Sequence, residues 1–322
     1  MRPVLPCCGA LVLVPILAAG AFQAAQAPPD TEIFLAPLKS AGGLLEVGTP
    51  VNITVNPGYD NQPFFTPDGK SVLFTSIRGP AAPAGGGSLT QTDIYRYHIA
   101  SKTVARVTQT AEGEYSPTVM PDGRRISVIR VEADGTQRLA SIAPSGPKIQ
   151  VDVILPDVKP VGYHAWADEH TVAMFILGAG GAPATLQVAD TRTGSARLIA
   201  TDIGRSLQRM PGTGATRHIS FVQRTRDGDK MTLTINQLDA ASGQVTPLTP
   251  AVDGAREADL AWTPGGTLLM AKDGVLYGWK RGQQGWKEVA ALEKLSLNGV
   301  SRLAVSPAGD YLALVALATQ GR

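Results

Sequence analysis

Residues 66–76 read TPDGKSVLFTS, a tight turn followed by a run of apolar and β-branched side chains. Proline presets φ for the first corner of such a turn, aspartate hydrogen-bonds its own backbone, and glycine accepts a positive φ without steric strain. The run after the turn has the composition of a β-strand, and an apolar run also precedes the turn. The stretch therefore predicts a β-hairpin that turns at Pro67, Asp68 and Gly69.

The same turn returns along the whole chain. Further copies are Met120–Gly123, a degenerate Trp166–Glu169, Met210–Gly212, Thr263–Gly266 and Ser306–Gly309. Five steps separate Pro67 from Pro307, so the average repeat is 48 residues long. This period is typical of propeller blades and of helical arrays. The β-branched and aromatic residues that flank the turns exclude helices.

Each repeat also continues into a third and a fourth strand. The clearest pair is Thr92–Ile99 followed by Thr103–Thr108, and similar pairs are Thr185–Ala189 with Ala196–Ala200 and Leu233–Leu238 with Gln244–Thr249. Four strands per repeat are typical of the blade of a β-propeller. The sequence thus predicts an all-β, six-bladed β-propeller with four-stranded antiparallel blades. A two-sheet sandwich with irregular turns is the alternative, and the regular spacing argues against it.

The last blade is incomplete at the C-terminal end, where only one further strand, Tyr311–Leu317, follows the final turn. The missing strands are found near the N-terminus. Thr31–Leu35 resembles the third strand of the first repeat, and Pro50–Thr54 resembles its fourth strand. A half-built blade would expose unpaired backbone groups at its edge. We therefore expect N- and C-terminal strands to close the last blade together.

The N-terminal residues have the layout of a secretory signal peptide. Arg2 precedes an apolar stretch at 10–19, and small residues offer cleavage after Ala21 or Ala27. We expect residues 1–27 to be a signal peptide and residues 28–322 to form one propeller domain, located in the periplasm or secreted. The apolar stretch is too short to span a membrane. Cys7 and Cys8 lie before it, so the mature chain would have no cysteine.

The charge pattern excludes some classes of partner. The chain has 29 Lys and Arg against 27 Asp and Glu, without a long run of either sign. A nucleic-acid footprint is therefore absent, and a membrane-surface helix is unsupported. We expect a monomer whose partner is an envelope or secreted protein.

Candidate site residues come from aligning the six repeats. The innermost strand of each propeller blade lines the central channel, and the loops that enter these strands form a funnel-like face. Five residues before the turn proline or its counterpart, the ring consists of Gln62, Ser116, Tyr163, Ser206, Asp259 and Arg302. With the neighbouring positions, the candidate binding residues are Asn61, Gln62, Tyr115, Tyr163, His164, Arg205, Asp259 and Arg302. Tyrosine and arginine are residue types favoured at interface hot spots.

Acidic residues in the same region suggest an alternative. Asp60, Glu114 and Glu257 occupy equivalent repeat positions, with Asp259 nearby. Together they could hold a calcium ion, and the protein would then be a small-molecule hydrolase or lyase with a divalent cation in its channel. The competing interpretation is that these carboxylates are solvated or cap backbone groups. A purely structural or sugar-binding propeller is a third interpretation.

No catalytic residue and no cofactor are predicted by the main interpretation. The four histidines share no local spacing suited to a metal pair or to a nucleophile and base, and a Gly-x-Ser-x-Gly elbow is absent. His164 could bind a ligand or act as a base, but a packed histidine is the more frequent case. Phe65, Trp166 and Trp262 share a place just before their turns, which predicts packing between blades.

The repeated pattern resembles the repeats of the TolB propeller family, which are related to PD40 and WD40-like repeats. Its elements are a strand, Pro-Asp-Gly, a second strand, an Asp-Ile-Tyr strand and a closing Arg-Val-Thr strand. Residues 63–69, 92–95, 106–108 and 116–123 carry the match, which covers about a third of the chain. The resemblance implies an exported, six-bladed, non-catalytic protein that binds partner proteins through its funnel. It departs from TolB in that only about 30 residues precede the first blade, so we expect no separate α/β domain.

Overall fold

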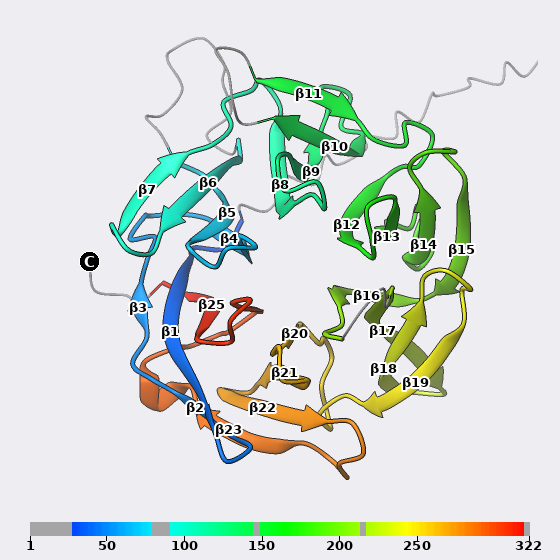
Figure 1. Cartoon of the computed structure of the whole chain (residues 1–322). Helices are drawn as coiled ribbons and strands as arrows, with labels where there is room; N and C mark the ends of the chain where they lie inside the picture. The colour runs from blue at the N-terminus through cyan, green and yellow to red at the C-terminus, as the bar shows by residue number, and fades with distance from the viewer. Residues whose placement is uncertain (1–27, 79–90, 144–148, 213–216, 319–322) are drawn as a thin grey trace, which may run out of the picture.

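The computed structural model describes residues 28–78, 91–143, 149–212 and 217–318 of the chain. Six antiparallel sheets are arranged in a ring around a central axis (Figure 1). This arrangement confirms the predicted six-bladed β-propeller. The predicted signal peptide at residues 1–27 lies outside the described residues.

Five of the blades are built from four consecutive strands that run from the channel to the outer edge. Blade 1 consists of β4 (Asp60–Phe65), β5 (Ser71–Ser76), β6 (Asp93–His98) and β7 (Thr103–Arg106). Blade 2 consists of β8 (Gly113–Val119), β9 (Ile126–Val131), β10 (Gln137–Ala143) and β11 (Gln150–Val153). Blade 3 consists of β12 (Val161–Trp166), β13 (Thr171–Ile176), β14 (Thr185–Asp190) and β15 (Ala196–Thr201).

The next two blades follow the same order. Blade 4 consists of β16 (Ile203–Arg209), β17 (His218–Asp227), β18 (Lys230–Asp239) and β19 (Val245–Pro250). Blade 5 consists of β20 (Leu260–Trp262), β21 (Thr267–Lys272), β22 (Val275–Lys280) and β23 (Lys287–Ala291), after which a short 3₁₀ turn, η1 (Glu293–Leu295), leads to blade 6.

Blade 6 joins the two ends of the chain. Its strands are β24 (Arg302–Val305), β25 (Tyr311–Leu317), β1 (Thr31–Ala41) and β3 (Val51–Asn52). β1 pairs antiparallel with β25 along its first part, with Thr31 opposite Leu317 and Pro37 opposite Tyr311. The predicted closure of the last blade by N- and C-terminal strands is therefore confirmed.

An additional hairpin extends blade 6 beyond the four expected strands. β1 continues to Ala41 and pairs there with β2 (Leu44–Val47), with Ala41 opposite Leu44. The two residues between them, Gly42 and Gly43, both have positive φ. A Gly-Gly pair between apolar runs is a hairpin signal, so this feature was readable from the sequence but was not predicted.

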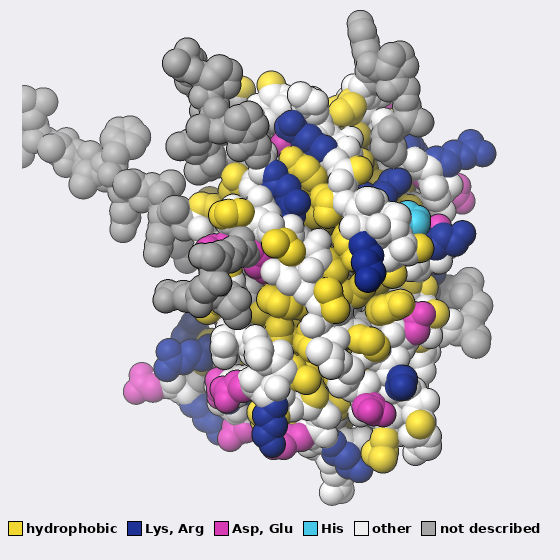
Figure 2. Space-filling view, turned by 90° about the vertical axis from the view of Figure 1, so that its left-hand side faces the viewer, with side chains coloured by type: hydrophobic (Ala, Val, Ile, Leu, Met, Phe, Trp, Pro, Cys, Tyr) yellow, Lys and Arg dark blue, Asp and Glu magenta, His cyan; other side chains and the backbone are white. Residues whose placement is uncertain are grey.

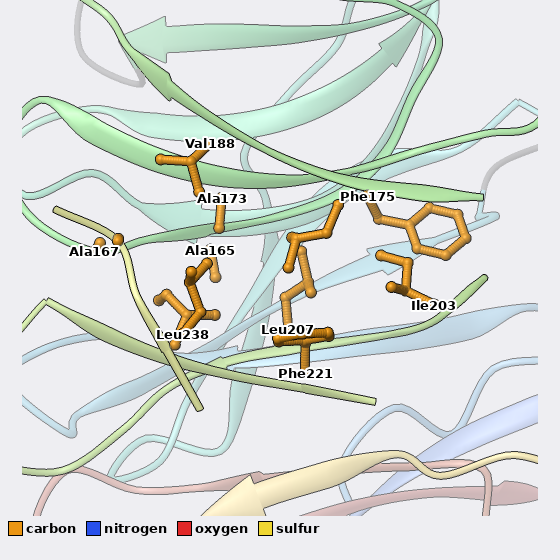
Figure 3. Close-up of a cluster of buried hydrophobic side chains, with 12 residues drawn as sticks. Ala165, Ala167, Ala173, Phe175, Val188, Ile203, Leu207, Phe221 and Leu238 are labelled. Atoms are coloured by element: carbon orange, nitrogen blue, oxygen red, sulfur yellow. The ribbon is translucent and has the colours of Figure 1, made fainter. Parts of the chain in front are cut away.

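Apolar side chains fill the space between adjacent blades. Figure 3 shows one such cluster, in which Phe175 of β13 lies beside Ile203 of β16, and to which Leu207 and Phe221 of blade 4 also belong. Two tryptophans add a hydrogen bond to the preceding blade: Trp166 Nε1 donates to Ser127 Oγ, and Trp262 Nε1 donates to Ser220 Oγ, both at 2.9 Å. The prediction that the residues before the turns pack between blades is confirmed.

The threonine of the closing Arg-Val-Thr strand links three segments of the chain. Thr108 Oγ1 accepts a hydrogen bond from the Ile94 N–H at 2.8 Å and donates to Glu114 Oε2 of the next blade at 3.1 Å. Thr54 Oγ1 likewise accepts from the Ile33 N–H at 3.0 Å and contacts the Glu32 carboxylate at 2.5 Å. The repeat of this arrangement explains why both fourth-strand segments end on threonine.

The outer surface of the ring is mixed in character. On the side that Figure 2 shows, basic, acidic and apolar side chains lie next to one another. The exposed large apolar residues include Leu44, Val51 and Leu198, which belong to edge strands. In the part of the chain that the structure describes, no helix is long and apolar enough to cross a bilayer.

Two of the repeated turns, at Gly69 and Gly309, closely approach the turn of the preceding blade. In four of the repeated turns the glycine N–H donates to the carbonyl oxygen three residues earlier, as from Gly309 to Ser306 at 2.9 Å. Gly309 has a φ of +75°, and a Cβ built on it would lie 2.9 Å from Cγ of Pro264 in the preceding blade. Gly309 is therefore required twice, because it adopts the positive φ of the turn and because it leaves room for Pro264 of the preceding blade.

We expect Gly309→Ala to lower the free energy of unfolding more than Gly123→Ala. Gly123 has a similar φ of +68°, but a Cβ there would meet nothing within 4 Å. Both variants carry the backbone strain of an L residue at positive φ, about 1 kcal/mol or more, and only Gly309→Ala adds a clash with the next blade. Chemical denaturation of both variants measures the difference. Equal destabilisation would contradict the packing of the turns between blades.

Candidate functional site

The central channel forms a concave feature large enough to bind a ligand or a segment of a partner. It has a volume of about 930 Å³ and is lined by the innermost strands of all six blades, β4, β8, β12, β16, β20 and β24, and by their turns. All six members of the ring predicted from the repeat alignment lie on its wall: Gln62, Ser116, Tyr163, Ser206, Asp259 and Arg302. The alignment thus placed these six positions on the channel wall, whereas the candidates Asn61 and Tyr115 are not among the lining residues. The role of these residues in binding stays a prediction.

Charged side chains from three blades meet at the channel. Arg205 of blade 4 places Nη2 at 2.6 Å from Oδ2 of Asp259, and its Nε at 3.3 Å from Oδ1. Arg302 of blade 6 places Nη1 at 3.6 Å from the same Oδ1. Asp259 and Arg302 are each only 14% exposed. One carboxylate in blade 5 is therefore shared by two guanidinium groups.

The same network reaches a fourth blade through Arg302. Its Nη2 donates to the hydroxyl of Tyr163 at 2.9 Å, and its Cζ lies 4.9 Å from the centroid of the tyrosine ring. Tyr163 itself meets Phe175 edge to face at 5.6 Å. Blades 3 and 6 face each other across the ring (Figure 1). Arg302 and Tyr163 thus connect opposite sides of the channel.

Other ring residues support the backbone of the neighbouring blade. Gln62 Oε1 accepts hydrogen bonds from the Ser116 N–H at 2.8 Å and from Thr75 Oγ1 at 2.7 Å. Gln62 and Ser116 both have positive φ, at +57° and +53°, within irregularities of their strands. Such bulges redirect a side chain out of the regular alternation. Asn61, a further candidate, uses its Oδ1 to accept from the Gln62 N–H at 2.8 Å.

His164 is a packed residue with 8% exposure. Its Nε2 lies 2.7 Å from Ser127 Oγ, the atom that also accepts from Trp166. Burial lowers the pKa of the imidazole to about 4, because the charged form is disfavoured away from water. His164 is therefore neutral at physiological pH and takes part in the contact between blades 2 and 3.

The four carboxylates considered as calcium ligands are each bound to different partners. Asp60 accepts from Arg78 at 3.3 Å and from Asn56 at 3.2 Å, Glu257 pairs with Arg224 at 2.9 Å, and Asp259 belongs to the network already described. Glu114 accepts from Thr108 and Thr110. Among the described residues, no group of three or more His, Cys, Asp or Glu side chains is placed to hold a metal ion. The structure does not bring these carboxylates together.

Burial dominates the electrostatics of two of these carboxyl groups. Glu114 and Asp60 have no exposed surface. Desolvation raises the pKa of Glu114 to about 7 and raises that of Asp60 as well, against the opposing effect of their hydrogen bonds. The carboxylate of Glu114 thus ties the start of β8 to the segment after β7, and that of Asp60 ties the start of β4 to Asn56 and Arg78. Both carboxylates accept from side chains, so they are neither solvated nor caps of the backbone groups that the competing interpretation expected.

The end of the channel at which Tyr163, Arg205, Asp259 and Arg302 lie is its mouth. Tyr59, which the sequence did not single out, interacts with residues of the mouth although it is not part of the channel lining. Burial raises the pKa of its phenol to about 12, and the charges of Arg302 and Arg205 and the phenols of Tyr163 and Tyr115 act on it. Tyr59 directly precedes Asp60, so extending the repeat alignment by one position would have found it. Tyr115 is part of the same group of phenols.

No protein-family model and no curated protein matches this sequence. Similar solved structures include TolB from Acinetobacter baumannii, at 14% identity and a TM-score of 0.54 over 91% of this chain. The chain spans 65% of the length of that protein. The Agrobacterium tumefaciens protein assigned as a TolB has 15% identity and a TM-score of 0.61, covering 90% of this chain and 99% of its own.

A chain of the nidogen/laminin complex shows a similar fold. It has 12% identity and a TM-score of 0.56, covering 89% of this chain and 98% of its own. At such identities the likeness establishes the fold. That fold is the TolB-like six-bladed propeller, as the repeats of the sequence indicated.

Calcium should not change the melting temperature of the protein. A ligand that binds only the native state raises its stability, and the four candidate carboxylates do not form one site among the described residues. Thermal unfolding with calcium chloride and with a chelator, at equal ionic strength, measures this. A rise with calcium that Asp259→Asn removes would contradict our description of the site.

Glu114→Gln should change how stability depends on pH. With a folded pKa of about 7 and an ordinary value of 4.5, Glu114 is protonated in the native state and ionised in the unfolded state between these pH values. The contribution of Glu114 to the free energy of unfolding is therefore complete below pH 4.5 and is lost as the pH rises through 7.

The wild-type protein should accordingly lose stability relative to Glu114→Gln over that window. The loss amounts to about 3 kcal/mol at most, since a tenfold difference in proton affinity between the two states corresponds to about 1.4 kcal/mol. Denaturation of both proteins from pH 4 to pH 8 gives the difference directly. Parallel curves would show that the native state accommodates the ionised carboxylate as well as water does.

Proposed function

We propose that this TolB-like six-bladed propeller is a non-catalytic protein-binding module that engages its partner through the channel mouth. The observation that carries the proposal is the network of Tyr163, Arg205, Asp259 and Arg302, which brings side chains of four blades to one place. Tyrosine and arginine are enriched among the residues that dominate binding energy at interfaces.

The geometry of the channel suits such a role. Arg302 is held by a hydroxyl and an aromatic ring, and Arg205 by both oxygens of one carboxylate. Side chains fixed in this way lose little conformational freedom when a partner binds, which favours affinity. Apolar side chains of the inner strands that also line the channel and are only partly buried, among them Phe64 and Val305, offer area for burial.

The fold supports the same conclusion. A chain with this fold occurs in the nidogen/laminin complex, which is an assembly of two proteins. We further propose that the protein is exported, because residues 1–27 have the pattern of a secretory signal peptide. The partner would then be a periplasmic, envelope or secreted protein, bound by a monomeric propeller.

Capture of the tagged protein from a crosslinked envelope extract of its native host tests the proposal. A partner bound in stoichiometric amount should be retained by the wild-type protein and reduced at least tenfold by Arg205→Ala. Arg192→Ala is the matched control, because Arg192 is also paired with an aspartate, Asp190, but lies exposed on an outer turn.

Loss of the partner counts only if the variant is folded, which circular dichroism and thermal unfolding establish. Tyr163→Phe provides a milder second variant that keeps the ring beneath Arg302 and removes its hydroxyl. A partner retained equally by Arg205→Ala, Tyr163→Phe and the wild-type protein would overturn the proposed binding face.

A further inference from the structure

The channel mouth carries more positive than negative charge. Arg205 and Arg302 are both directed at the single carboxylate of Asp259. Glu257, the other carboxylate that acts on Arg205, is itself paired with Arg224 at 2.9 Å. Two guanidinium groups therefore share one carboxylate at a place where the Arg302 and Asp259 side chains are mostly removed from water. Interactions of a guanidinium group in such a place with an anion are stronger than at an exposed surface.

Hydrogen-bond donors at the mouth also lack acceptors. Ser116 Oγ is buried and has no hydrogen-bond partner among the described residues. Gln62 uses its Oε1 as an acceptor twice, whereas its amide nitrogen makes no hydrogen bond to the described residues. Ser116 and Gln62 come from the same ring of the repeat as Arg302. Two further donors, one of them buried, thus line the channel that holds the two arginines.

The phenols near the two arginines are further hydrogen-bond donors without an acceptor. The hydroxyls of Tyr59 and Tyr115 make no hydrogen bond to the part of the chain that the structure describes, and both phenols interact electrostatically with their surroundings at the mouth. Burial raises the pKa of Tyr59 to about 12, so its hydroxyl remains a donor at neutral pH. The mouth is therefore rich in donors, and its two nearby carboxylates, Asp259 and Glu257, are already paired with arginines.

We propose that the channel mouth binds a carboxylate group carried by an acidic peptide segment of the partner protein. This inference rests on the proposed function and specifies the chemistry of the partner. A planar monoanion matches two guanidinium groups that share one carboxylate, and guanidinium groups bind carboxylates through paired hydrogen bonds. Arg205 already holds Asp259 in this way. A dianion such as phosphate would be repelled by Asp259, which lies between the two arginines, about twice as strongly as a monoanionic carboxylate.

The size of the channel indicates a peptide as the carrier of the carboxylate. At about 930 Å³, the channel is much larger than a carboxylate alone needs. Beyond the charged mouth its wall includes Phe64, Trp262 and Val305, which are only partly buried. A peptide segment can place an acidic side chain or its terminal carboxylate at the mouth and apolar side chains against this wall.

Acetate serves as the probe of the carboxylate site, with the full-length mature protein. We expect sodium acetate to raise the melting temperature above that in sodium chloride of equal ionic strength, and acetamide to have no effect. NMR signals of the Arg205 and Arg302 side-chain N–H groups should shift on titration. Arg302→Gln should weaken acetate binding at least tenfold, whereas Arg192→Gln, on the outer surface, should leave it unchanged.

Asp259→Asn provides a second variant that keeps the proposal falsifiable if Arg302→Gln does not fold. It removes the internal carboxylate, so acetate should bind at least tenfold more tightly than in the wild-type protein. Equal acetate affinity in the wild-type protein, Arg302→Gln and Asp259→Asn would overturn the site. Stronger binding of phosphate than of acetate would overturn the carboxylate as its ligand class.

Different results would overturn the protein-binding module and the carboxylate site. A partner that is captured through Arg205 while acetate shifts neither the melting temperature nor the arginine signals would overturn the carboxylate and leave the binding module standing. Acetate binding by a protein that captures no partner would overturn the assignment to a partner peptide. A captured partner that an acidic pentapeptide displaces, but its glutamine counterpart does not, is the result we expect.

Discussion

Antiparallel pairing between β1 and β25 closes the ring, and the arrangement of the channel depends on it. The two strands lie near opposite ends of the sequence, yet they are paired from Thr31 and Leu317 to Pro37 and Tyr311. Pairing over such a distance carries a large loop-closure entropy, which the burial of whole strands must offset. Most side chains of β1 and β25 along this pairing are buried. Closure also removes the open edges that a half-built blade would leave.

Ring closure places Arg302 opposite Tyr163. Arg302 begins β24, which is held in blade 6 only through β25 and therefore through β1. From there its guanidinium reaches Tyr163 in blade 3 and shares Asp259 with Arg205. The charged network thus forms only in the complete ring. The binding face that we propose is a property of six blades together and of none of them alone.

Much of this architecture was predictable because short stretches of sequence determine the turns and strands of each repeat. The turn at Pro67 and its copies, the two pairs of strands in each repeat and the threonine that ends the fourth strand each have a local physical cause. The same regularity allowed ring positions such as Gln62 and Arg302 to be aligned before their positions in space were known. The β1 to β2 hairpin was missed although its Gly-Gly turn is a recognised signal.

The contacts within the site could not be predicted from the alignment alone. Equivalent positions lie on the same ring, but the rotamer of each side chain decides which partner it meets. Asp60, Glu114 and Glu257 are equivalent in the repeat, yet they bind Arg78, two threonines and Arg224 respectively. The expectation of a shared cation rested on equivalence, whereas the side chains turn toward neighbours within their own pair of blades.

Site-specific photocrosslinking in the native host tests the binding face most directly. A photoreactive phenylalanine analogue replaces Tyr115, a partly buried residue that interacts with Tyr59 next to the channel mouth. This is a change between aromatic side chains. The same analogue replaces Leu198, which is 60% exposed on the outer strand β15. Our account predicts one crosslinked protein species from position 115 and none from position 198. A species crosslinked from position 198 but not from position 115 would contradict it.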